Sequence, residues 1–136
     1  MPRHPLARSR IALVAVTATT AVLLLAGCTP AHKNPVATFE VAGVETYKIE
    51  LVTPALLKHA EQLLKGEHVA AIPLGRVVRD SPGVNKPWSW HIDPTTLEFA
   101  QITIEVCDGL PSYVEDHTVT SPDYCPWSAK VIKIDK

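Results

Sequence analysis

The chain has 136 residues, with 13 Lys and Arg against 14 Asp and Glu. Residues 1–27 contain three of the arginines and no acidic residue, so residues 28–136 carry 10 basic and 14 acidic side chains, a formal charge of −4. This balance argues against a nucleic-acid partner, which would require a basic surface. The 109 residues after position 27 are enough for one domain with a modest core.

Residues 1–27 have the pattern of a secretory leader. Three arginines precede the apolar run 11–26, which is too short to span a bilayer as a resident helix. The run closes with LAGC at residues 25–28, which resembles the lipobox of bacterial lipoproteins. The resemblance implies cleavage after Gly27 and a lipid on the Cys28 sulfur, whereas the alternative is an ordinary secretory signal with a chance cysteine. We therefore expect a lipoprotein anchored in the cell membrane and facing its extracytoplasmic side.

The mature chain is predicted to begin with a tether. Residues 28–43, which start with the lipidated Cys28, contain two prolines and small polar residues without an amphipathic period, as in a flexible linker. Residues 44–136 are expected to form a single domain. Its first strand is predicted over residues 44–52, where Tyr47, Ile49 and Leu51 alternate with polar side chains.

Residues 53–66 carry the signals of an amphipathic helix. Thr53 suits the N-cap, Pro54 suits the first helical position, and Gly66 suits the residue after the C-cap. Leucines and an alanine at helical spacing form one apolar stripe. His59 falls on the polar side and is predicted to face solvent.

Residues 69–79 are rich in β-branched side chains but contain Pro73 and Gly75. A proline cannot donate a ladder hydrogen bond, so this segment is predicted to be an edge or bulged strand. Arg76 and Arg79 are interpreted as charges that keep such an edge soluble.

The stretch 87–109 contains the longest β-like pattern. Trp88 and Trp90 fall on one face of a predicted short strand, and the Asp-Pro-Thr-Thr sequence at 93–96 predicts a turn. Residues 100–106 alternate again, which predicts a second strand with one buried face made of Ala100, Ile102, Ile104 and Val106.

The C-terminal part predicts a short helix within 108–117, a loop at 118–127 and a closing strand at 128–135. These elements predict an α+β fold with a small antiparallel sheet of four to five strands. One main helix and one short helix are expected on one face of that sheet. A ferredoxin-like arrangement is one candidate topology.

Cys107 and Cys125 are the two cysteines that remain once Cys28 is assigned to the lipid. An even pair in an extracytoplasmic protein predicts a disulfide. Closing a loop of about 18 residues would stabilise the domain by roughly 3 kcal/mol in the chain-entropy model. The alternative is a zinc site that uses both thiolates with His91 or His117, but the paired short cysteine spacings of structural zinc modules are missing.

Five sequence blocks make up a recognisable signature. They are GRVV at 75–78, PWSWHIDP at 87–94, EVCD at 105–108, YVE at 113–115 and CPWS at 125–128. Through these blocks, residues 44–134 resemble a small domain family found at the N-terminus of a calmodulin-binding protein and in short secreted bacterial proteins. The resemblance implies a compact α+β domain with a disulfide. Such a resemblance is better evidence for a fold than for a function.

Candidate ligand-binding residues share aromatic or His–carboxylate chemistry, and they are Trp88, Trp90, His91, Asp93 and Trp127. Exposed tryptophans suit a sugar, a peptide or a partner protein, and a histidine beside a carboxylate suits a polar ligand. The structural alternative, which we favour, places two tryptophans in the core and uses Asp93 in a turn. No catalytic or phosphate-binding motif is recognisable, so we predict no catalytic residue, no metal and no cofactor.

These patterns predict a membrane-anchored lipoprotein that acts as a binding module for an unknown protein or small ligand, and not an enzyme. The first alternative is an extracellular protease inhibitor with 118–127 as its reactive segment. The second is a cell-envelope hydrolase that uses His91 and nearby carboxylates.

Overall fold

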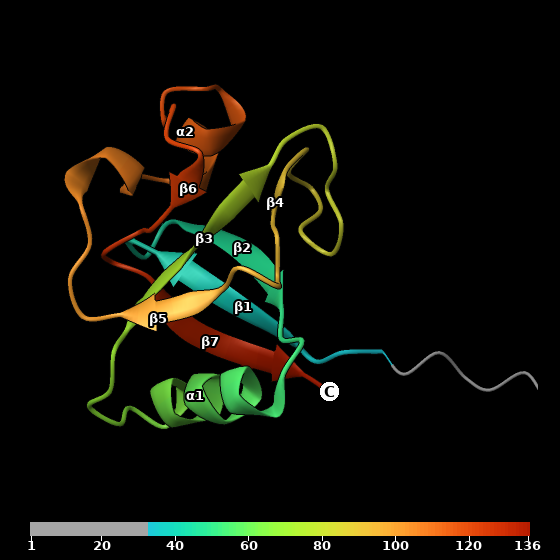
Figure 1. The fold of residues 1–136 in the computed structure, drawn as a ribbon, viewed down its shortest axis with the longest axis vertical. Coiled ribbons are helices and arrows are strands. Elements are labelled where there is room, and N and C mark those ends of the chain that lie inside the picture. Colours follow the sequence, from blue (N-terminus) through green and yellow to red (C-terminus); the bar gives the residue numbers. More distant parts are fainter. Residues whose placement is uncertain (1–32) are drawn as a thin grey trace, which may run out of the picture. The chain divides into compact units, whose positions relative to one another are not determined.

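Two small antiparallel sheets form the framework of the computed structural model, which describes residues 33–136 (Figure 1). The predicted signal peptide and Cys28 lie outside the described residues. Within the described part, no helix has the length and apolar character needed to cross a membrane.

The first sheet has the order β2-β1-β7, with β1 at Val36–Val41, β2 at Glu45–Glu50 and β7 at Lys130–Asp135. A tight turn joins β1 to β2, and its residues Ala42 and Gly43 have φ angles of 53° and 71°. The prediction that residues 36–41 belong to a flexible tether is therefore wrong. The side chains of Ala37, Thr38, Phe39 and Val41 are buried, because β1 is the central strand of this sheet.

Strand β7 carries a β-bulge that was not predicted. Thr38 of β1 faces Lys133, whereas the next residue, Phe39, faces Val131, so Ile132 is the extra residue. A bulge shifts the inward and outward alternation by one position. Ile132 is accordingly exposed, while Val131 is buried.

Helix α1, Pro54–Leu64, confirms the predicted caps. The Leu56 N–H donates to Thr53 Oγ1 at 3.2 Å, and Gly66 follows the C-cap with a φ of 78°. The prediction that His59 faces solvent is wrong. Its ring stacks on Phe99 with centroids 4.4 Å apart, and its Nε2 lies 2.7 Å from the Ala70 carbonyl oxygen.

The second sheet is organised around β3, Ile72–Val78, which pairs with β4 (His91–Ile92), β5 (Glu98–Ala100) and β6 (Asp123–Tyr124). The predicted edge position of this strand is therefore wrong. Pro73 is accommodated opposite Phe99, and a Cβ on Gly75 would collide with Ile92, so the close approach of β4 requires glycine there.

The predicted strand over residues 100–106 is also wrong. Pairing with β3 ends at Ala100, the chain bends at Gln101, and residues 105–107 form a 3₁₀ turn. The side chains expected to form a buried face instead point into solvent, namely those of Ile102, Ile104 and Val106.

The short helix α2, Pro111–Glu115, forms within the predicted segment. Arg79, predicted to be a solubilising charge, donates from its guanidinium to the Val114 and Val119 carbonyls at 2.6 and 2.8 Å. It thereby fastens the segment that follows β3 to α2 and to the loop after it.

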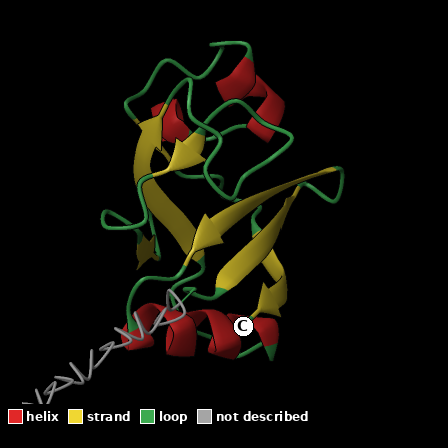
Figure 2. Cartoon of the chain, turned by 90° about the vertical axis from the view of Figure 1, so that its right-hand side faces the viewer, coloured by secondary structure: helices red, strands yellow, loops and turns green. Residues whose placement is uncertain are grey.

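The α+β class, the antiparallel pairing and the two helices are confirmed, but the strands divide between two sheets. A ferredoxin-like arrangement is not confirmed. Helices α1 and α2 lie at opposite ends of the domain and not together on one face (Figure 2). The core between the sheets is aromatic, since Tyr47 of β2 packs edge-on against Tyr124 of β6 with centroids 5.4 Å apart.

Candidate functional site

Trp90 belongs to the core. It is 1 % exposed, its ring packs edge-on against Tyr124 at 5.4 Å, and it lies 6.0 Å from the ring of Tyr47. Burial raises the pKa of the Tyr47 hydroxyl well above its usual value. Trp90 therefore supplies apolar volume, and no ligand can reach it in this state.

Trp88 is half-buried and covers the free edge of β2. Its Nε1–H donates to the Thr46 carbonyl at 2.8 Å, and beside it the Lys48 N–H donates to Asn85 Oδ1 at 2.7 Å. An uncovered strand edge invites pairing with other chains, and these two side chains block that edge. Trp88 thus has a structural role.

Asn85 is the main structural residue that the sequence analysis missed. It is fully buried, and its side-chain amide also donates to the Trp90 carbonyl at 2.9 Å. The only local signal was an asparagine two positions after Gly83, which is typical of any turn.

His91 and Asp93 do not form a joint site. His91 Nδ1 is hydrogen-bonded to the Ser81 carbonyl, and its ring lies under Gly83. Asp93 makes the predicted turn, in which its Oδ1 accepts from the Thr95 hydroxyl at 2.7 Å and from the Thr95 N–H at 3.0 Å. These bonds hold the pKa of Asp93 below its usual value. Over residues 33–136, no cluster of His, Cys, Asp or Glu is arranged to hold a metal ion.

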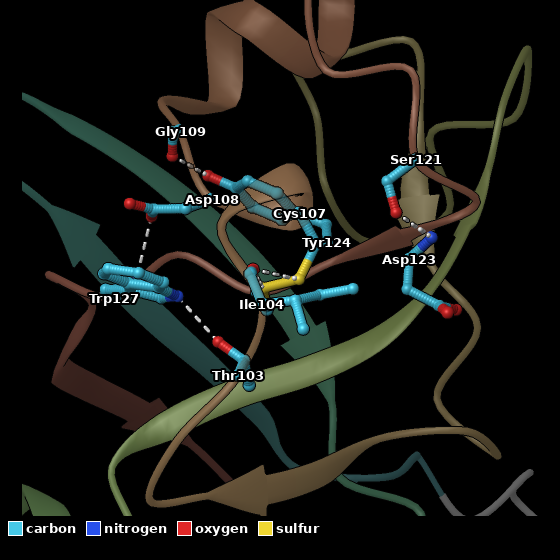
Figure 3. The surroundings of a disulfide bond; sticks show 10 residues. Thr103, Ile104, Cys107, Asp108, Gly109, Ser121, Asp123, Tyr124 and Trp127 are labelled. Atoms are coloured by element: carbon cyan, nitrogen blue, oxygen red, sulfur yellow. Dashed lines mark hydrogen bonds between the residues drawn. A yellow bond between two sulfur atoms is a disulfide. The ribbon is translucent and has the colours of Figure 1, made fainter.

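Cys107 and Cys125 are joined as a disulfide, with their Cα atoms 5.0 Å apart (Figure 3). The Cys125 N–H also donates to the Cys107 carbonyl at 2.7 Å. Both cysteines are buried, so the bond forms a fixed base beneath the segments 101–106 and 126–128.

Trp127 lies on the surface beside this bond and is 49 % exposed. Its Nε1–H donates to Thr103 Oγ1 at 2.6 Å, and its backbone N–H donates to Asp108 Oδ1 at 2.8 Å (Figure 3). The indole is therefore held in one orientation against the 103–108 segment. Of the three tryptophans, it is the one that a partner can reach best.

We use the name apolar patch for Trp127 together with the three exposed apolar side chains of the adjoining segment 102–106. Ile102 is 87 % exposed, Ile104 68 % and Val106 66 %. A shallow pocket of about 260 Å³ runs between Trp127 and residues 101–103, with Ile72 also in its lining. Several large apolar side chains exposed on adjoining segments of a small domain are typical of an interaction site.

The described sequence also matches a known family. Residues 34–136 match the family model of the BP-74 N-terminal domain. The chain belongs to this family. Because the match begins at Asn34, the family domain includes strand β1, which the sequence pattern alone assigns to the tether. Comparisons with curated proteins and with solved structures gave no match.

In this member of the family, the predicted ligand-binding residues are not brought together. Trp90 lies in the core, Trp88 on the β2 edge, and Trp127 beside the disulfide, while His91 and Asp93 stabilise separate turns. Among the surfaces described, the apolar patch has the properties that binding requires. It offers apolar contacts on a rigid base, and its described residues include no pair of groups suited to acid–base chemistry.

Proposed function

We propose that this protein is a lipid-anchored, extracytoplasmic binding module that holds a partner protein on its apolar patch. The observation that carries the proposal is the exposure of Ile102, Ile104 and Val106 on a segment that is hydrogen-bonded to the half-exposed Trp127. Tryptophan is enriched among the residues that carry most of the binding energy in protein interfaces, and the burial of large aliphatic side chains adds a hydrophobic contribution.

The proposed anchor would keep the domain close to the membrane. Strand β1 begins at Val36, eight positions after the proposed lipidation site Cys28. Eight extended residues span at most about 28 Å. In Figure 1 the described chain starts on the side of the domain opposite the segment between β5 and α2, which contains most of the patch. A partner could therefore approach the patch from the side away from the anchor.

The reactive-loop alternative has less support. The segment 118–127 would have to enter a protease cleft, but Val119, Tyr124 and Cys125 within it are buried and β6 ties it to β3. A hydrolase based on His91 has no observation in its favour, since His91 is engaged by a backbone carbonyl. The resemblance to the N-terminal domain of a calmodulin-binding protein adds no partner, because calmodulin binding need not be carried by this domain.

Site-specific photo-crosslinking in cells tests the proposed surface. A photoreactive residue at Ile102 should give a defined cross-linked product with another protein. Val44 is a matched control, because it is also exposed and β-branched but lies in the β1–β2 turn, outside the patch. Products from both positions alike, or from neither, would contradict the proposal.

The anchor is tested separately. Replacing Cys28 by serine removes the sulfur that would carry the lipid, so the protein should move from the membrane fraction to the soluble extracytoplasmic fraction. An unchanged distribution would show that the chain is not held through Cys28.

A further inference from the structure

We propose that the partner of the apolar patch is an extended protein segment with alternating apolar side chains and basic flanks, which docks as an added strand along residues 101–104. This inference rests on the proposed function, because it names the class of partner for the same surface. Strand addition combines backbone pairing with side-chain pockets at every second position.

The first argument is the state of the backbone. Strand β5 is the outer strand in the order β4-β3-β5, so one of its edges carries no neighbouring strand of the second sheet in the described chain. Outside the β3–β5 ladder, the N–H and C=O groups of residues 101–103 make no backbone hydrogen bond within residues 33–136. Unpaired backbone groups next to an open edge are ready to pair with an incoming strand.

The second argument is the spacing of the side chains. Ile102 and Ile104 are both exposed, while Thr103 between them is half-buried and bonded to Trp127. This period of two is that of an extended chain, whose alternate side chains lie on one face. A partner strand with the same period would place its apolar side chains against both isoleucines, on the face opposite Thr103.

The third argument is charge. Residues 98–108 contain Glu98, Glu105 and Asp108 and no basic residue. Lys130, three residues after Trp127, lies opposite Glu40 in the β1–β7 ladder. Acidic side chains before and after an exposed apolar segment favour a partner with basic residues at its ends. They disfavour a second copy, which would bring the same acidic flanks, and an anionic bilayer, which would repel them.

The surface is also held ready for binding. The disulfide at Cys107 fixes the C-terminal end of the segment 101–107, and the Trp127–Thr103 hydrogen bond fixes the segment nearer its start. A surface that is ordered before binding loses less conformational entropy when the partner docks.

Binding of a synthetic peptide tests the inference. The probe is an eight-residue peptide of alternating valine and threonine with two lysines at each end, and the matched control carries glutamates in place of the lysines. The protein is the mature chain from residue 28 with Cys28→Ser, which contains every described residue. Tryptophan fluorescence and amide NMR shifts of residues 101–104 report the binding.

We expect the lysine-ended peptide to shift these amides and to bind at least tenfold more tightly than the glutamate-ended peptide. Methylating the backbone nitrogens on the pairing side of the peptide should abolish binding, whereas methylating those on the opposite side should not. Ile102→Asp should weaken binding at least tenfold, and Val44→Asp should leave it unchanged.

Three results would overturn the inference. If both peptides bound equally tightly, the charge of the partner's ends would not matter. If N-methylation on either side of the peptide left binding unchanged, the peptide would not pair as a strand. Concentration-dependent dimers or binding to vesicles of phosphatidylglycerol, either one abolished by Ile102→Asp, would assign the patch to a second copy or to lipid. A peptide that fails while Ile102 still cross-links a protein in cells would overturn this partner class and leave the proposed function standing.

Discussion

The indole Nε1–H of Trp127 donates to Thr103 Oγ1 at 2.6 Å and so joins the two segments on either side of the Cys107–Cys125 disulfide. The disulfide and the bond from the Trp127 N–H to Asp108 Oδ1 also join these segments, but the contact with Thr103 is the one made by the indole itself. It holds the exposed ring against the segment that carries Ile102 and Ile104. The orientation of the Trp127 ring therefore depends on a polar contact.

Thr103→Val removes the acceptor and keeps the side-chain shape. We expect a loss of about 1 kcal/mol in the free energy of unfolding, because one partly exposed hydrogen bond is lost. Trp127 should also become more mobile, which a lower fluorescence anisotropy would reveal. Thr120→Val is the control, since Thr120 is exposed and outside the patch. An equal effect of both substitutions would show that the bond to Trp127 has no special role.

Replacing Cys107 and Cys125 together by serine should destabilise the domain by about 3 kcal/mol, as expected for opening a loop of this length. Urea unfolding with and without reductant provides the measurement. The wild-type protein should also gain two hydrogens in mass on reduction. If reductant changed neither the mass nor the urea midpoint, the two thiols would be unpaired in the purified protein.

Asn85→Ala should be among the most damaging single polar substitutions. The substitution removes the side-chain amide that binds both the Lys48 N–H and the Trp90 carbonyl, and these two groups would then lie beneath the surface without a hydrogen-bond partner. We expect a loss of about 3 kcal/mol in unfolding free energy, since each unsatisfied buried group costs roughly 1–3 kcal/mol. Asn34→Ala is the matched control, because Asn34 makes one long bond of 3.4 Å to Glu50. Similar losses for both would refute the role assigned to Asn85.

The turn at Asp93 should make stability sensitive to acid. Its pKa is lowered in the folded state by the Thr95 hydroxyl and N–H, so the folded protein favours the ionised carboxylate more than the unfolded chain does. This contribution is present above the unfolded pKa of about 3.9 and is lost as the pH falls through the lower folded value. Asp93→Asn should therefore flatten the fall in urea midpoint between about pH 5 and pH 2. An unchanged pH profile would contradict this assignment.

The parts of the fold that were predicted correctly depend on neighbours in the sequence. The caps of α1 at Thr53 and Gly66, and the turn at Asp93, depend on residues within four positions of each other. Local chemistry decides such features, so the residues alone reveal them.

The parts that were missed depend on contacts between distant residues. The alternation over 100–106 indicates an extended chain but cannot show that a partner strand stops at Ala100. The central position of β3 likewise needs three partners that lie far apart along the chain, at 91–92, 98–100 and 123–124. The exposed side chains of Ile102, Ile104 and Val106 therefore appear in the sequence as a pattern that predicts a buried face.

Val36, at the start of β1, lies opposite Asp135, near the end of β7. The two strand ends that lead out of the domain thus leave it at the same place, on the side where the proposed lipid anchor would be attached. A fluorescent reporter fused after Lys136 would be crowded against the bilayer, and it would leave the recognition surface unobstructed. Circular permutation through a short linker between these ends should be tolerated, and it would permit new termini at the β1–β2 turn.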